Sequence, residues 1–86
     1  MRVLIPNPLR SYTADAAAVS AQGRTLDELA TDLDRQYPGV RFRIIDEQGA
    51  VRPHIKFFVN RRQKRDLKEV LAEGDEVMIV CALSGG

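Results

Sequence analysis

Residues 25–39 read TLDELATDLDRQYPG, and this stretch predicts an amphipathic helix. Thr25 and Glu28 have the spacing of a capping box. In such a box the threonine hydroxyl accepts from the third backbone N–H, and the glutamate reaches back to the N–H of Thr25. Pro38-Gly39 ends the helix. The apolar residues share one face, which must be buried against another element; they are Leu26, Leu29, Ala30, Leu33 and Tyr37.

Strand-like segments surround this helix. Residues 2–5 form a short apolar run before Pro6, and residues 16–21 are expected to be the second arm of a hairpin. After the helix, residues 55–60 and 77–81 each place alternate apolar side chains on one face. The predicted core positions of these two strands are Ile55, Phe57, Val59, Val77 and Ile79.

This order of elements predicts an α+β fold in which one main helix covers one face of a mixed sheet. Two layers of this kind bury the helix face and one sheet face in a single core. It is the plan of the β-grasp, or ubiquitin-like, fold. The sequence shows no repeat or interdomain linker, so residues 1–86 are expected to form a single domain.

The connecting segments are less regular. Val40, Phe42, Ile44 and Ile45 must bury apolar surface, but their spacing fits neither a helix nor a strand clearly. Residues 46–49 predict an exposed turn, and residues 61–65 a charged connection. After that connection, Asp66 is expected to cap a short helical turn; its apolar residues are Leu67, Val70 and Leu71.

Composition excludes several classes of protein. The 86 residues are 44% apolar and 29% charged, which is typical of a folded domain. A net charge of +1 argues against a nucleic-acid binder. Cys81 is the single cysteine, which excludes an internal disulfide and a cysteine-based metal site and favours the cytoplasm. The N-terminal apolar run is too short for a signal peptide, and no stretch is long enough to span a bilayer, so no membrane partner is expected.

The sequence ends with ALSGG at residues 82–86, directly after the predicted strand 77–81. Glycine lacks a Cβ and accepts almost any backbone conformation. We therefore expect residues 82–86 to be a flexible tail that enters a narrow active site and presents the carboxylate of Gly86 there. Gly86 would be a substrate group, because the chain offers no nucleophile, general base or metal set of its own.

Three stretches together resemble the ubiquitin-like sulfur-carrier proteins that serve molybdopterin, thiamine and cysteine synthesis. Residues 5–10, IPNPLR, are similar to the first loop of the cysteine-synthesis carriers. The helix from Thr25-Leu26 to Pro38-Gly39 is the second stretch, and the third is Val59-Asn60 with EGDEV at residues 73–77 and the final Gly85-Gly86. Two features depart from the resemblance. These carriers often have proline at the position of Cys81, and the segment at residues 63–65 is more basic than expected.

The resemblance implies a chemistry for Gly86. An ATP-dependent, E1-like activating enzyme would adenylate its carboxylate, and sulfide would then replace AMP and leave a thiocarboxylate. Leu83, Ser84 and Gly85 would enter the partner's active site with it. The chain would be a protein co-substrate rather than an enzyme, with no cofactor of its own, since ATP is used by the partner.

The resemblance also implies where the sulfur goes. A sulfur-accepting biosynthetic enzyme would receive it, and residues 5–10 favour a cysteine pathway over methionine, siderophore, thiamine or molybdopterin pathways. A metallopeptidase that trims a precursor to Gly86 is a further candidate partner. Two other functions stay open: a ubiquitin-like modifier joined to target lysines through Gly86, and a non-covalent β-grasp interaction domain.

Several side chains outside the tail are candidates for binding. Leu4, Phe58, Met78 and Val80 alternate with the core positions and should lie on the other sheet face, either as a docking patch for the activating enzyme or as an unpartnered face. The cluster Arg61, Arg62, Lys64 and Arg65 is interpreted as a solvated turn or as a means of steering an acidic partner. His54 is expected to be structural or exposed, and Cys81 to behave as a small apolar group.

Overall fold

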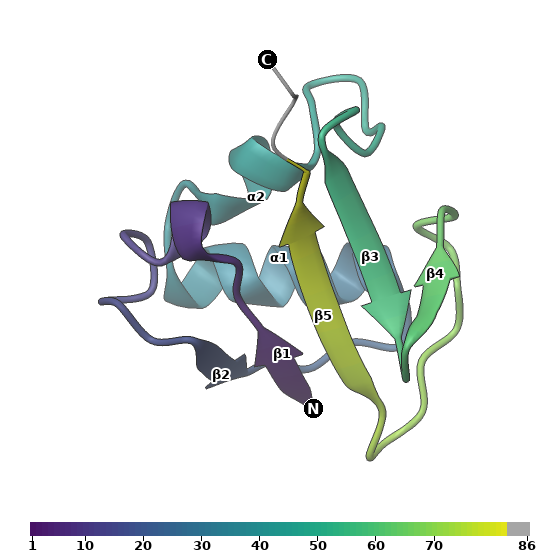
Figure 1. Ribbon diagram of the computed structural model, residues 1–86. Helices are drawn as coiled ribbons and strands as arrows, with labels where there is room; N and C mark the ends of the chain where they lie inside the picture. The colour runs from purple at the N-terminus through teal and green to yellow at the C-terminus, as the bar shows by residue number, and fades with distance from the viewer. Residues whose placement is uncertain (83–86) are drawn as a thin grey trace.

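The computed structural model describes residues 1–82, which form a sheet with its main helix on one face (Figure 1). The strands are β1 (Arg2–Leu4), β2 (Ala18–Ser20), β3 (Ile55–Val59), β4 (Arg62–Lys64) and β5 (Glu76–Cys81). The helices are α1 (Leu26–Gln36), α2 (Val40–Ile44) and a single 3₁₀ turn, η1 (Asn7–Leu9).

The strands of this sheet lie in the order β2-β1-β5-β3-β4. The pair β1·β5 is parallel, and the pairs β1·β2, β3·β5 and β3·β4 are antiparallel. The sheet is therefore mixed, with β5 at its centre and α1 behind it (Figure 1). The predicted α+β, β-grasp architecture is confirmed.

The start of α1 shows why this helix forms where the sequence predicts it. Thr25 Oγ1 accepts from the backbone N–H of Glu28 at 3.2 Å. The second hydrogen bond of the predicted capping box differs. The Glu28 carboxylate accepts from the backbone N–H of Arg24 at 3.1 Å, and not from that of Thr25. The N–H groups of Leu26 and Asp27 donate to carbonyls of residues 69 and 67. Donors that a helix leaves unpaired at its start are thus satisfied partly by a neighbouring segment.

The core lies between α1 and the sheet. The predicted apolar face of α1 is buried, except that Tyr37, which follows the helix, is only partly so. Facing it are the predicted side chains of β3 and β5, with Val3 of β1. The link from β2 to α1 passes close to the helix at Gly23, where a Cβ would lie 2.4 Å from the backbone nitrogen of Leu29.

Three predictions about the connections are wrong or incomplete. Residues 40–44 form the short helix α2, which buries Val40 and Ile44 one turn apart. Residues 62–64 form the edge strand β4 within the segment predicted to be a charged connection. Residues 66–71 make no helix: Asp66 accepts from the N–H of Lys68 in a turn, and the backbone beyond it runs beside the start of α1. The carbonyls of Leu67 and Glu69 accept from the N–H groups at the start of α1, so they are not used in a helical turn of this segment.

Candidate functional site

The end of β5 fixes the position from which the C-terminal residues leave the fold. Cys81 pairs with Ile55 of β3, and the N–H of Ala82 donates to the carbonyl of His54 at 2.7 Å. The ladder therefore continues to the last described residue. The predicted tail residues Leu83, Ser84, Gly85 and Gly86 lie outside the described part of the chain.

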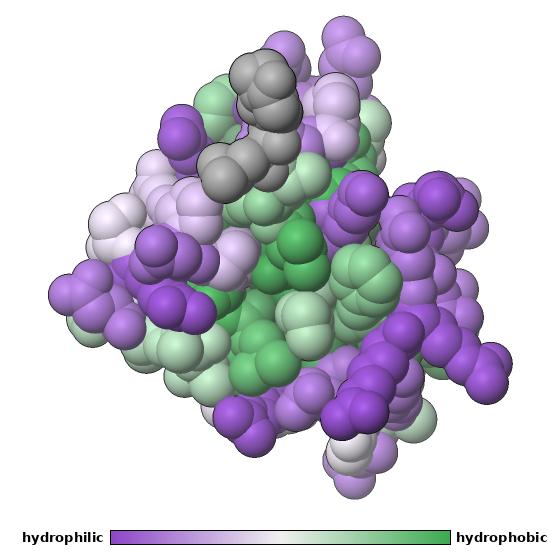
Figure 2. Space-filling model, in the orientation of Figure 1, coloured by the Kyte–Doolittle hydropathy of each residue, from purple (hydrophilic) through white to green (hydrophobic). Residues whose placement is uncertain are grey.

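The four predicted docking residues come together on the sheet face opposite α1. Met78 of β5 lies in register with Leu4 of β1 on one side and with Phe58 of β3 on the other. Val80 is two residues nearer to the end of β5 on the same face, and all four side chains are half-buried. Figure 2 shows apolar side chains gathered over these strands with hydrophilic ones around them. We call Leu4, Phe58, Met78 and Val80 the sheet patch.

A shallow hollow extends the sheet patch toward β2 and the first loop. It is lined by Leu4, Met78 and Val80 together with Pro6, Arg10 and Ala17. The Arg10 side chain is held there by a bond from its Nε to the carbonyl of Ile5, at 3.0 Å. The loop that carries it is closed by the buried Thr13, whose hydroxyl lies 2.9 Å from the carbonyl of Ala16. The loop at residues 5–10, which carried the family resemblance, therefore borders the candidate docking surface.

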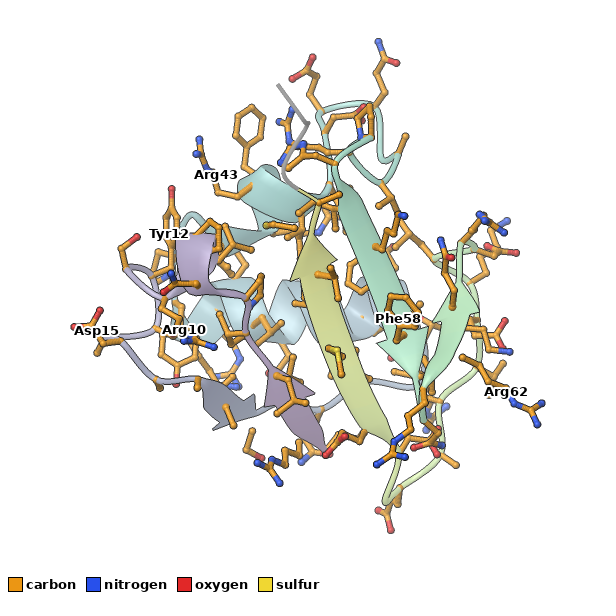
Figure 3. All side chains as sticks on the ribbon, viewed as in Figure 1. Arg10, Tyr12, Asp15, Arg43, Phe58 and Arg62 are labelled. Carbon is orange, nitrogen blue, oxygen red and sulfur yellow. The ribbon has the colours of Figure 1, made fainter. Side chains whose placement is uncertain are left out.

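A second group of side chains surrounds the base of the tail. Phe42 and Arg43 of α2, with Arg52 and His54 of the segment before β3, line a hollow that also includes Cys81 and Ala82. We call Phe42, Arg43, Arg52 and His54 the exit surface. Figure 3 labels Arg43 on α2, close to the end of β5, and Phe58 lower on β3. The sequence reasoning missed this group, since α2 was not predicted and His54 was interpreted as structural or merely exposed.

The exit surface is organised around Phe42 and Arg52. Arg52 Nε donates to the carbonyl of Phe42 at 2.6 Å, and its guanidinium carbon lies 4.6 Å from the centre of the Phe42 ring. Such an arrangement allows a cation–π contact. The Phe42 side chain is still 55% exposed. An aromatic ring held in place and left in solvent is a common feature of protein-binding surfaces.

Cys81 lies between the two surfaces and is partly buried. Burial raises the pKa of its thiol, and the nearby Arg43 charge opposes that rise without cancelling it. The thiol is therefore mainly protonated at neutral pH and is a poor nucleophile. This agrees with the prediction that Cys81 behaves as a small apolar group.

The basic cluster lies around β4, away from the end of β5 (Figure 3). Asn60 and Arg61 both have positive φ, 50° and 73°, in the turn that joins β3 to β4. Lys64 forms an ion pair with Glu69 at 3.2 Å. Arg61, Arg62 and Arg65 are exposed. The cluster thus sits on a hairpin and an edge strand rather than on the predicted solvated connection.

Within residues 1–82, no group of three or more His, Cys, Asp or Glu side chains is arranged to hold a metal ion. No helix in this part of the chain has the length and apolar character needed to cross a membrane. What the geometry offers is a folded body, an apolar sheet face and a central strand that leads to the C-terminal residues. These features define a small domain of the β-grasp, or ubiquitin-like, class.

The family follows from comparison with known proteins. A model of the ThiS family matches residues 3–86, and the chain belongs to this family of ubiquitin-like sulfur carriers. It is 35% identical over 89 residues to the sulfur carrier protein CysO of Mycobacterium tuberculosis, an alignment that covers 98% of this chain and 96% of that protein.

Solved structures agree with this assignment. The crystal structure of M. tuberculosis CysO has a TM-score of 0.90 and 33% identity, covering 95% of this chain and 98% of that one. The Amycolatopsis orientalis BexX/CysO complex contains a chain with a TM-score of 0.90 and 28% identity, covering 99% and 98%. Small archaeal modifier protein 1 of Methanosarcina acetivorans, at 0.82 and 22% with coverage of 99% and 94%, shares the fold.

Proposed function

We propose that this chain is a sulfur carrier protein of cysteine biosynthesis whose working group is the carboxylate of Gly86. The observation that carries the proposal is the 35% identity to the sulfur carrier protein CysO over nearly the whole chain. The family match also runs through residue 86, so it includes the Gly-Gly pair. The CysO likeness favours a cysteine pathway over the methionine, siderophore, thiamine and molybdopterin alternatives.

The chemistry begins with a poor electrophile. A carboxylate oxygen of Gly86 attacks the α-phosphate of ATP on an E1-like activating enzyme, and pyrophosphate leaves. A sulfide equivalent then attacks the acyl carbon, AMP leaves with the former carboxylate oxygen, and the product is a thiocarboxylate. A sulfur-accepting biosynthetic enzyme uses this sulfur as its nucleophile. The chain supplies the substrate group, and the partners supply catalysis and bind ATP.

The fold contributes a rigid mount for this group. Because β5 is paired with β1 and β3, the start of the tail has a fixed position relative to the sheet patch. Gly86 lies eight residues after Met78, which is at most about 29 Å of extended chain. An activating enzyme that holds the sheet patch therefore needs its adenylation site within that distance of its docking surface.

The sheet patch is the proposed docking surface for the activating enzyme. Half-buried apolar side chains in one row across neighbouring strands offer a continuous contact area, as expected for the centre of an interface.

A metallopeptidase that trims a precursor to Gly86 remains a further proposed partner. The proposed site of action is the cytoplasm, where a carrier that loads sulfide meets reduced sulfur.

Intact-mass analysis after co-expression with the activating enzyme of the same organism tests the proposal. The expected result is a mass gain equal to the replacement of one oxygen by sulfur. Deletion of Gly86 should abolish this gain and leave the melting temperature almost unchanged. Met78→Asp should reduce the gain while the protein stays folded, because Met78 lies at the centre of the sheet patch.

The alternatives give different results. Isopeptide-linked adducts without a thiocarboxylate would identify a ubiquitin-like modifier and refute the carrier. A non-covalent interaction domain would keep its activity without Gly85 and Gly86 and lose it when Phe58 is replaced by aspartate. A wild-type chain that gains no sulfur in the presence of an enzyme that adenylates it would also refute the carrier.

A further inference from the structure

The exit surface has features of a binding site that the sheet patch does not explain. Among residues 1–82, two large apolar side chains are well exposed, Phe42 at 55% and Val70 at 77%. Val70 lies in the segment that leads toward the start of β5, whereas Phe42 lies beside its end. An exposed aromatic ring is thus located where the tail leaves the fold.

The two arginines of the exit surface, Arg43 and Arg52, make it positively charged. Arg43 and His54 are exposed, and Arg52 is half-buried because it is held against Phe42. Asp46 has a lowered pKa, mainly through the N–H of Ala50 and in smaller part through the charge of Arg52. The positive charge of Arg52 is therefore partly balanced by the carboxylate of Asp46. The Arg43 side chain has no hydrogen bond or ion pair with any group of residues 1–82, which makes it the available cation.

The length of the tail limits how far a partner can stay from this surface. Residues 83–86 span at most about 14 Å when fully extended. The N–H of Ala82 is bonded to the carbonyl of His54, so the start of that span is fixed beside the exit surface. Any enzyme that encloses Gly86 must therefore bring the entrance of its active site close to Phe42, Arg43 and His54.

The length of the tail also indicates which anionic groups lie next to Arg43 in the complex. With the tail extended into an enclosed site, the phosphates that react at Gly86 lie a tail length away from Arg43. The partner groups next to Arg43 are instead the side chains around the entrance. Since this surface is cationic with one exposed aromatic ring, the complementary entrance carries carboxylates around an apolar contact.

We propose that the exit surface docks onto a carboxylate-lined entrance of the activating enzyme's active site, as a contact separate from the sheet patch. This inference rests on the proposed function, because it needs an enzyme that acts on Gly86. The sheet patch holds the body of the chain, and the exit surface aligns the tail with the entrance. Arg43 supplies the charge and Phe42 the apolar contact.

The test measures the rate of ATP-dependent modification of Gly86 by the purified activating enzyme as a function of carrier concentration. The variants are Arg43→Glu and Phe42→Ser. Their matched controls are Arg24→Glu, which makes the same charge change, and Val70→Ser, which likewise replaces an exposed apolar side chain with serine. Both control positions are exposed and lie beside the start of α1. Arg43→Glu should raise KM for the carrier about fivefold to tenfold with kcat little changed, while Arg24→Glu stays within about twofold.

Salt separates a local charge contact from other effects. For the wild-type chain, KM should rise with ionic strength, and for Arg43→Glu it should rise much less, because the attraction that salt screens has been removed. Phe42→Ser should raise KM several-fold without changing the salt dependence, and Val70→Ser should match the wild type. Unchanged circular dichroism and melting temperature would show that each variant is folded.

Each outcome gives a decision. If the wild-type chain is modified at Gly86 and Arg43→Glu behaves like Arg24→Glu, the exit-surface contact is refuted and the carrier function stands. If the product is an isopeptide rather than a thiocarboxylate, the same comparison of variants still decides the contact, while the carrier function falls. A wild-type chain with no modification at Gly86 under any of these conditions would refute both.

Discussion

Val77 and Val80 allow one substitution to be compared on the two faces of the same strand. Val77 is fully buried between Val3 of β1 and Val59 of β3, with α1 above it. Val80 lies three residues further along β5, in the half-exposed sheet patch. Replacing either residue with alanine removes the same two methyl groups, so any difference in effect reports the surroundings.

The size of the difference follows from burial. Two buried carbons contribute roughly 1.6 kcal/mol of transfer free energy, at about 0.8 kcal/mol each. The cavity left behind adds to this, because paired strands on both sides prevent collapse, so Val77→Ala should lower the free energy of unfolding by about 2–3 kcal/mol. For a chain of this size that is a fall of roughly 10–20 °C in melting temperature. Val80→Ala should cost less than about 1 kcal/mol.

Urea denaturation followed by circular dichroism measures the stability, and the kinetics of Gly86 modification measure docking. Val77→Ala should keep a nearly normal KM under conditions where it is folded. Val80→Ala should keep its stability and show a raised KM. Equal losses of stability in the two variants would mean that the sheet patch is covered like a core, and the assignment of that face to docking would be wrong.

Three further predictions concern other parts of the chain. Thr25→Ala should lower the free energy of unfolding by about 1 kcal/mol in urea denaturation, because the hydroxyl caps α1. The Asp75 pKa is lowered by the N–H of Ala72 and then by the Asn60 amide, so its stabilising effect is present above the unfolded value near 3.8 and is lost as pH falls through the lower folded value. Asp75→Asn should therefore lose less stability than the wild type in acid denaturation. Cys81 should react with iodoacetamide more slowly in the folded chain than in urea, since burial raises its pKa; equal rates would contradict this burial.

The main helix and the faces of the long strands could be predicted because each has a local signal. The cap at Thr25 and the spacing of its apolar residues define α1 without tertiary information. Alternate burial along β3 and β5 matches the alternation of their side chains, including the outward position of Met78. The sheet patch was therefore predictable as a set of outward positions on strands that pair.

The elements that were missed lack such a signal. The five residues of α2 are too few to establish a helical period, and arginines interrupt them. The strand β4 has no buried residue, so its pattern resembles a polar connection. Its turn places Arg61 at positive φ, where glycine is the usual residue, so the common hairpin signal is absent.

The exit surface could not be predicted for a different reason. Its residues come from α2 and from the segment before β3, and they surround the end of β5, which is distant from both in the sequence. Only the pairing of β3 with β5 brings His54 next to Ala82. A surface assembled from separate segments has no single motif, and here the tertiary structure was needed to recognise it.

The central position of β5 also determines how the protein responds to mechanical force. The N-terminus and the end of β5 lie at opposite ends of the sheet (Figure 1). A pull on the C-terminal residues acts along β5, so the ladders to β1 and β3 are loaded in shear and their hydrogen bonds must yield together. An edge strand pulled sideways would instead peel away one bond at a time. We therefore expect the body of the chain to resist unfolding when the C-terminal residues are pulled.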